Sequence, residues 1–345
     1  MAEPATRSRR SRKARVLLAV KAALVILALV LAGQAIASQW SRVRGNLGAL
    51  SLGWTLLSAG LALAGLVTIA LAWREVLAAL GSPLPTGVAG RVFLIAQLGK
   101  YIPGSVFALA GQMELATRYD VPRRRAGTAS LVTLGLNVAA GGVVAVVAVP
   151  LLPSGSAQPY LPVLLLLPLV GLLHPRPLNA LLDRALRLLH RPGLDQPMTG
   201  RGVARALGWC LSSWVLLGLH VWALCRDVGA QAPVAALAVT GFAAAWLVGF
   251  LVVLAPAGFG PREAVLVGVL GGSLVGGSGA ALVVAAVSRL ILVVADVVLA
   301  GLALLVGHSP VQHRNALAVD AGGQPAPAGA TGLPPVPLAA PERTD

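Results

Sequence analysis

A cationic side chain beside a glycine and proline break marks one segment of this chain as a candidate anion site. The segment is Gln97-Leu98-Gly99-Lys100-Tyr101-Ile102-Pro103-Gly104. A helix that begins beside Pro103 would present free backbone N–H groups and the positive end of its dipole. Together with the Lys100 ammonium group, such a helix start is suited to a phosphate. The alternative is that Lys100 only extends its charge toward water at an interface.

A second segment has the same character and reads Pro256-Ala257-Gly258-Phe259-Gly260-Pro261-Arg262-Glu263-Ala264. Pro261 is well placed as the first residue of a helix that follows Gly260. Arg262 would lie beside the positive end of that helix, where its planar group can hold a phosphate with two hydrogen bonds. We expect Glu263 to favour the same end and to pair with Arg262 or Lys100. The alternative is a helix cap held by a local ion pair.

Other ionisable residues lie inside apolar runs, where a charge is costly and points to function. Arg289 and Asp296 share one helix face two turns apart, and a structural pair and a ligand contact both remain open. Glu114 and Arg118 are predicted to form a pair on a helix surface. We expect His220 to be a hydrogen-bonded packing residue and not a proton relay.

These patterns predict an anion-binding site, with no catalytic residue, no metal and no cofactor. The predicted binding residues are Lys100, Tyr101, Pro103, Gly104, Gly260, Arg262, Glu263 and Arg289. The chain has no phosphate-binding loop of the G-x-x-x-x-G-K-[ST] type. It has no His, Cys or Asp cluster at metal-binding spacing. We therefore expect that it is not an enzyme.

The composition indicates the environment in which these residues are placed. Hydrophobic residues make up 57% of the 345 residues, charged residues make up 11%, and the mean hydropathy is +0.82. A soluble fold carries about 25% charged residues, so the sequence predicts an all-α, polytopic, integral membrane protein. The formal net charge is +15 with only 4% aromatic residues. The basic residues lie before and between apolar runs. We therefore expect them to set the orientation in the membrane and to attract an anionic leaflet, and we expect no nucleic acid partner.

We predict that six apolar runs cross the membrane, five because of their length and one because of the charges that follow it. They cover about residues 16–37, 52–72, 126–149, 161–173, 206–224 and 280–306. The run at 161–173 is interrupted by prolines, and the positive-inside rule supports it because a basic loop follows. The run at 16–37 exceeds the apolar region of a signal peptide. Residues 1–15 are predicted to be a basic cytoplasmic tail, and residues 307–345 a disordered Pro/Ala/Gly-rich tail that is also cytoplasmic.

Two further apolar segments, at about residues 88–119 and 233–277, contain the two breaks and are predicted to form broken hairpins. The first has basic flanks on both sides and is interpreted as re-entrant from the cytoplasm. The second is either re-entrant or fully crossing. A crossing, a broken hairpin and a crossing thus occur twice with opposite orientation, which predicts the inverted repeat of many transporters. The alternative is that Gly and Pro only kink ordinary membrane helices.

The two broken segments, followed by Ser288-Arg289-Leu290, resemble the lysylphosphatidylglycerol synthase transmembrane (flippase-like) family. The resemblance covers roughly residues 16–306 and identifies a stand-alone member without the soluble synthase domain. It implies that Lys100, Arg262, Glu263 and Arg289 line a path for a lipid headgroup. Two positions depart from the pattern: Lys100 stands where Arg is frequent, and Ala257 where a second Gly is common. Because no aminoacyl-transfer domain follows residue 306, we expect no lipid synthesis.

The leading functional hypothesis is a flippase-like protein that translocates or binds an anionic phospholipid or a lipid-linked carrier such as a polyprenyl phosphate. One alternative is a non-catalytic membrane scaffold for a partner enzyme of lipid or cell-envelope glycosylation. Its docking surfaces would be the basic loop at 174–205 and the C-terminal tail. A second alternative is a small-solute transporter. The cargo, its direction, the energy source and the oligomeric state stay open.

Overall fold

The computed structural model describes residues 50–102, 106–147, 174–188, 197–230, 234–251 and 260–306. Within these ranges the chain forms helices and connecting turns and no β-strand, which confirms the predicted all-α class. The predicted crossings at 16–37 and 161–173 and both tails lie outside the described residues. So do Pro103, Gly104 and residues 256–259 of the two breaks.

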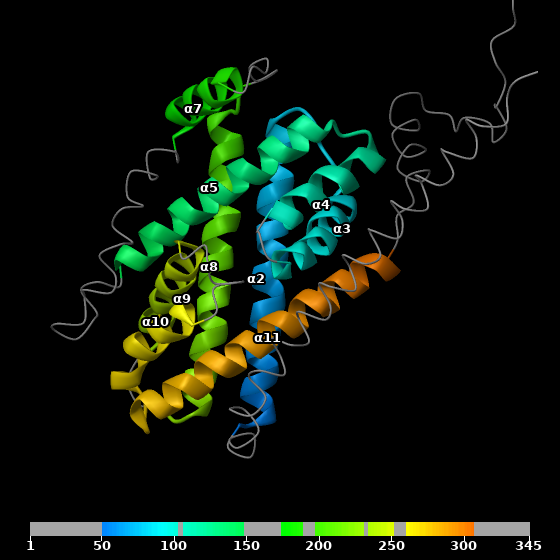
Figure 1. Ribbon diagram of the computed structural model, residues 1–345. Helices are drawn as coiled ribbons and strands as arrows, with labels where there is room; N and C mark the ends of the chain where they lie inside the picture. Colours follow the sequence, from blue (N-terminus) through cyan, green and yellow to red (C-terminus); the bar gives the residue numbers. More distant parts are fainter. Residues whose placement is uncertain are drawn as a thin grey trace, which may run out of the picture. The chain divides into compact units, whose positions relative to one another are not determined.

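The helices follow one another in an order that can be traced in Figure 1. Their bounds are α2 Leu52–Ala79, α3 Thr86–Gln97, η2 Leu98–Tyr101, α4 Val106–Ala116, η3 Thr117–Tyr119, α5 Arg123–Val147, α7 Pro175–Leu188, α8 Gly200–Asp227, α9 Ala235–Leu251, α10 Pro261–Leu270, η8 Gly271–Ser273 and α11 Gly277–Leu305. The order long, short, short, long occurs in α2–α5 and again in α8–α11.

Four of the described helices, α2, α5, α8 and α11, are long and apolar enough to cross a membrane. They coincide with the predicted crossings at 52–72, 126–149, 206–224 and 280–306. α2, α5 and α8 include polar turns beyond the predicted apolar runs. α2, for example, continues through Arg74 and Glu75 to Ala79. At 28 residues it is about 42 Å long, so it exceeds a hydrocarbon core of about 30 Å.

The two broken segments fold as pairs of short helices. α3, with 12 residues, is about 18 Å long and too short to cross alone. α4 turns back so closely that a Cβ atom on Gly99, in η2 directly after α3, would lie 2.7 Å from the backbone nitrogen of Ala108. In the second segment, a Cβ atom on Gly241 of α9 would lie 2.8 Å from a side-chain carbon of Val269 of α10. Small residues therefore permit the close packing of each pair.

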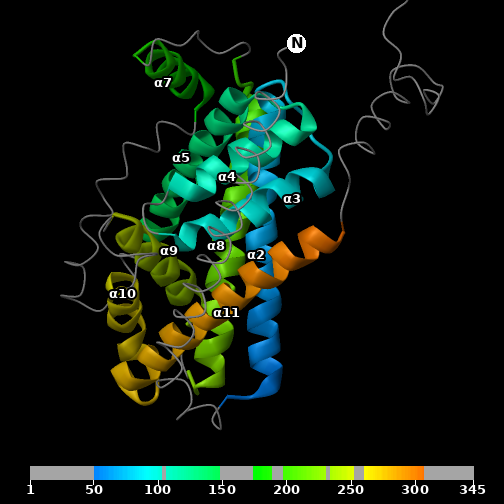
Figure 2. The ribbon, with the colours of Figure 1, turned by 45° about the vertical axis from the view of Figure 1, so that its right-hand side comes forward.

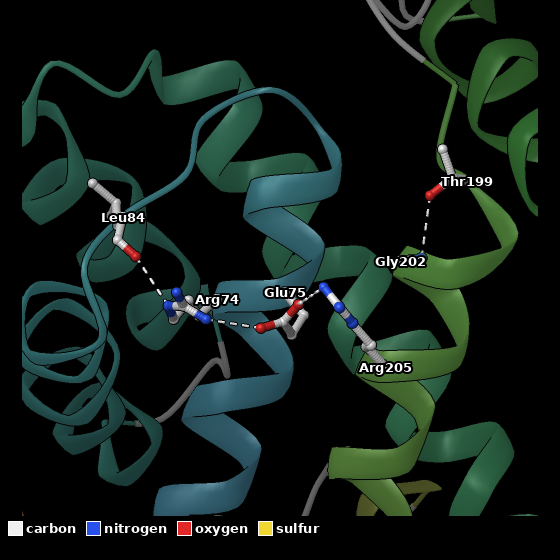
Figure 3. Close-up of polar contacts among 6 residues, drawn as sticks. All are labelled: Arg74, Glu75, Leu84, Thr199, Gly202 and Arg205. Atoms are coloured by element: carbon white, nitrogen blue, oxygen red, sulfur yellow. Dashed lines mark hydrogen bonds and ion pairs between the residues drawn. The ribbon is translucent and has the colours of Figure 1, made fainter. Parts of the chain in front are cut away.

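The first helices of the two halves lie side by side in opposite directions (Figures 1 and 2). At one end, the backbone N–H of Ser51 before α2 donates to the carboxylate of Asp227, the last residue of α8, at 2.9 Å. At the other end, Arg205 in α8 approaches Glu75 in α2, with 4.0 Å between nitrogen and oxygen (Figure 3). This antiparallel pairing is what an inverted repeat requires of these two helices, and the repeat itself stays a prediction.

The long helix α11 links the halves, because it packs against α3 of the first half and α10 of the second. Between α5, α8 and α9 the core contains the fully buried Trp214 and Phe242, whose ring centroids lie 6.3 Å apart. Indole N–H groups find partners in this apolar setting: Trp214 Nε1 donates to the Asn137 carbonyl at 2.9 Å. The structure thus places one helix beside both breaks of the chain.

Candidate functional site

Polar side chains on one stretch of α11 face the interior of the helical bundle. Ser288, Arg289 and Asp296 are exposed by only 1%, 5% and 4%. Arg289 and Asp296 are seven residues apart and therefore separated by about 10 Å along the helix axis. Each of them contacts a different broken segment, so α11 brings the two predicted motifs into one cluster.

Asp296 holds the first break. The Lys100 ammonium group lies 2.7 Å from Oδ2 of Asp296, and the Tyr101 hydroxyl donates to the same oxygen at 2.6 Å. The Lys100 side chain is 35% exposed, whereas that of Asp296 is 3% exposed. Lys100 therefore reaches both the buried carboxylate and the edge of the cluster. The structure thus brings Lys100 and Tyr101, two of the predicted binding residues, together with Asp296, which the prediction did not include. Their role in binding stays a prediction.

Glu263 holds the second break. Its Oε2 accepts a hydrogen bond from the backbone N–H of Gly260 at 2.7 Å. Its Oε1 pairs with Arg289 at 3.3 Å, and both side chains are buried. Gly260 has φ of +89°, a conformation that residues with a side chain rarely adopt. The pairing expected for Glu263, with Arg262 or Lys100, is therefore not the one that the structure has. Capping the start of α10 turns the other carboxylate oxygen toward α11, where Arg289 lies.

Arg262 has a different setting. Its guanidinium carbon lies 4.7 Å from the centroid of the Phe242 ring, the geometry of a cation–π contact. Its Nη2 is buried and has no hydrogen-bond partner among the described residues. Electrostatically it interacts with Arg289, Glu263, Tyr101 and Asp296. A buried donor without a described partner is costly and rare, so this atom is the candidate donor to a ligand in the cluster.

The charges of the cluster do not balance. Lys100, Arg262 and Arg289 are cations, and Glu263 and Asp296 are anions, so the five side chains sum to a formal charge of +1. An uncompensated charge inside a membrane protein is expensive. One phosphate or carboxylate from outside the described chain would offset it.

Most of the sequence matches one family model. The family model described as the lysylphosphatidylglycerol synthase transmembrane region matches residues 16–301. The chain belongs to this family. It is therefore a multi-pass membrane protein of a family associated with lipid handling. Comparison with curated proteins gives no significant match.

In this family member, a buried histidine joins three long helices beside the cluster. The Ser58 hydroxyl of α2 donates to the His220 carbonyl at 2.9 Å and lies 3.1 Å from Nδ1 of the same residue. Ser288 of α11 lies 3.0 Å from Nε2. Because the Ser58 proton is used by the carbonyl, the neutral ring would donate from Nδ1 and accept at Nε2. The ring contacts Phe242 edge-to-face at 5.5 Å between centroids, which connects it to Arg262.

For three other charged residues the structure gives partners that differ from the predicted ones, and two contacting residues were not predicted at all. Arg289 and Asp296 were left open as a structural pair, and each has its partner on another helix instead. Glu114 was expected beside Arg118, and the structure gives it an ion pair with Arg123 at 2.6 Å. Phe242 and Ser58 had no signal in the sequence, since one is an apolar residue and the other a small polar residue within a long apolar helix.

Proposed function

We propose that this protein binds the anionic headgroup of a membrane lipid at the cluster of Lys100, Arg262 and Arg289 and moves that lipid between leaflets. The observation that carries the proposal is the buried Nη2 of Arg262, which has no partner among the described residues. A phosphate group suits a guanidinium group well, because two parallel N–H groups can donate to two of its oxygens.

The exposure of the three cations supports a route to the site. Arg289 is almost fully buried, whereas the Lys100 side chain is 35% exposed. In this proposal a headgroup meets Lys100 first and then Arg262. The acyl chains stay in the bilayer, since the cluster lies among helices long enough to span it.

In the absence of a lipid, the carboxylates of Asp296 and Glu263 pair with two of the cations that would bind the phosphate. Asp296 holds Lys100, and Glu263 holds Arg289, when no headgroup is bound. A phosphate that approaches would bind Arg262 and share Lys100 and Arg289 with the two carboxylates. Each carboxylate then keeps a cation beside it, and the added negative charge offsets the formal charge of +1. In the same proposal the chain transfers no group itself, since both carboxylates serve as counterions.

A leaflet-exchange assay with the purified full chain in liposomes tests the substrate class. Labelled phosphatidylglycerol, a labelled polyprenyl phosphate and labelled phosphatidylcholine are compared at equal protein density. We expect exchange of at least one anionic lipid well above that of phosphatidylcholine. Equal rates for all three would contradict headgroup recognition. No exchange of any lipid would favour the scaffold hypothesis, and solute uptake without lipid exchange would favour the small-solute transporter.

A further inference from the structure

The short helix α7 keeps only part of its apolar side inside the protein. With 14 residues it is about 21 Å long, too short to cross a bilayer. Leu178 is 3% exposed and belongs to the core, and Leu182 packs against that core. Leu181 and Leu188, in contrast, are 49% and 80% exposed. Among the described residues nothing covers these two leucines.

Basic side chains border the open leucines. Arg184 lies three residues after Leu181 and four before Leu188, so the three positions neighbour one another on the helix surface. Arg184, Arg187 and Arg176 are all exposed. A helix with exposed leucines on one side and arginines on the adjacent side is typical of helices that lie in the interface of a membrane with anionic lipids.

Hydrogen bonds fix α7 to the end of a membrane-spanning helix. The Asn179 amide nitrogen donates to the Met198 carbonyl, and the Met198 N–H donates to the Asn179 amide oxygen, each at 2.9 Å. α8 begins directly afterwards, where the Thr199 hydroxyl accepts from the N–H of Gly202 at 3.2 Å (Figure 3). α7 is therefore attached directly before the first turns of α8, which carry Arg201 and Arg205.

The same end of the bundle is strongly basic. Arg125 of α5 donates to the Gly81 carbonyl just after α2, at 3.1 Å, so α5 begins at this end. Arginines that belong to this end are Arg74, Arg118, Arg123, Arg124, Arg125, Arg201 and Arg205, in addition to the three of α7. At the opposite end of α2 and α8 the described charges are Arg226 and Asp227. By the positive-inside rule the α7 end faces the cytoplasm, where the leaflet carries anionic lipids.

We propose that α7 lies in the headgroup layer of the cytoplasmic leaflet. Leu181 and Leu188 enter the acyl boundary, and Arg184 and Arg187 bind anionic phospholipid headgroups. This surface is separate from the cluster on α11, and it would hold whether or not the protein moves lipid between leaflets.

The test uses the full chain in lipid nanodiscs, in which both faces of the membrane are accessible. An environment-sensitive fluorophore is attached at Leu181→Cys, Leu188→Cys or, as a matched control on the basic side of the same helix, Ala180→Cys. The two native cysteines, Cys210 and Cys225, are buried, and wild type treated with the same dye gives the background. Quenching by lipids with a nitroxide on the acyl chain and by aqueous iodide is compared in phosphatidylcholine and in phosphatidylcholine with phosphatidylglycerol.

We expect labels at positions 181 and 188 to be quenched by the acyl-chain nitroxide and shielded from iodide, with the reverse at position 180. Phosphatidylglycerol should increase the nitroxide quenching, and Arg184→Gln with Arg187→Gln should remove that increase. Labels at 181 and 188 that remain open to iodide would overturn the proposal. Labels shielded from both quenchers would overturn it too, because they would indicate a protein partner or a second copy on this face.

Discussion

The ammonium group of Lys100 lies 2.7 Å from the carboxylate of Asp296 on α11, so the last described helix holds the first break of the chain. Arg289 on the same helix holds Glu263 at the second break. A single rigid helix therefore connects two broken segments from opposite halves. A displacement of α11 would reach both breaks at once, which is a direct way to couple them.

The pair of Lys100 and Asp296 predicts an asymmetric response to substitution. Lys100→Met leaves the buried Asp296 carboxylate with the Tyr101 hydroxyl as its described partner. Asp296→Asn leaves Lys100, whose side chain is 35% exposed and can reach water. We expect Lys100→Met to lower the free energy of unfolding by about 1–3 kcal/mol and Asp296→Asn by less. Unfolding in detergent measures both, and a larger loss for Asp296→Asn would contradict the assignment.

Glu263 has two separate structural roles that substitutions can divide. Glu263→Gln keeps an acceptor for the Gly260 N–H and removes the charge that faces Arg289, whereas Glu263→Ala removes both. We expect Glu263→Ala to be the less stable variant by about 1 kcal/mol, the usual effect of a lost cap.

A double-mutant cycle of Glu263→Gln and Arg289→Met then isolates the ion pair. We expect a coupling free energy of about 1 kcal/mol between the two positions. Strict additivity of the two single losses would mean that the contact contributes nothing to stability.

Gly99 predicts a steric effect at the first break. A Cβ atom there would lie 2.7 Å from backbone atoms of Phe107 and Ala108, which cannot move aside as a side chain can. We expect Gly99→Ala to push α4 away from α3 and to lower stability by about 1–3 kcal/mol. Gly90→Ala, in the preceding helix α3 with nothing within 4 Å of the added carbon, is the control. It should be neutral or slightly stabilising, and thermal unfolding of both variants decides.

His220 predicts a loss of stability without a loss of exchange. His220→Ala removes a fully buried ring and leaves the hydroxyls of Ser58 and Ser288 without it. We expect the free energy of unfolding to fall by about 2–4 kcal/mol. Lipid exchange by the protein that remains folded should persist, with the same pH profile as that of wild type. A pH dependence that disappears in this variant would instead identify His220 as a proton relay.

The positions of the helices were more predictable from the sequence than the contacts between their side chains. The apolar runs predicted four helices that the structure describes, because hydrophobicity over about 20 residues is a local property. The Pro-Gly and Gly-Pro breaks likewise separated α3 from α4 and α9 from α10. The pairing of Lys100 with Asp296 was not predictable in this way, since it depends on how α11 crosses a helix almost two hundred residues earlier. Phe242 beneath Arg262 was missed because one aromatic residue in an apolar helix carries no positional signal.

The central claim is that Arg262 binds the lipid headgroup. Arg262→Ala loses the contact with Phe242 but also removes a buried donor without a partner among the described residues. Because these two effects oppose each other, the free energy of unfolding should stay close to that of wild type. Arg226→Gln is the control, since that arginine is exposed at the end of α8 and donates to the Ala230 carbonyl.

The most direct measurement is leaflet exchange of a labelled anionic lipid in liposomes that contain wild type, Arg262→Ala or Arg226→Gln at equal density. The account predicts exchange by wild type and Arg226→Gln, and at least a tenfold slower rate for Arg262→Ala, which corresponds to about 1.4 kcal/mol of lost headgroup interaction. Exchange by Arg262→Ala at the wild-type rate would contradict the account.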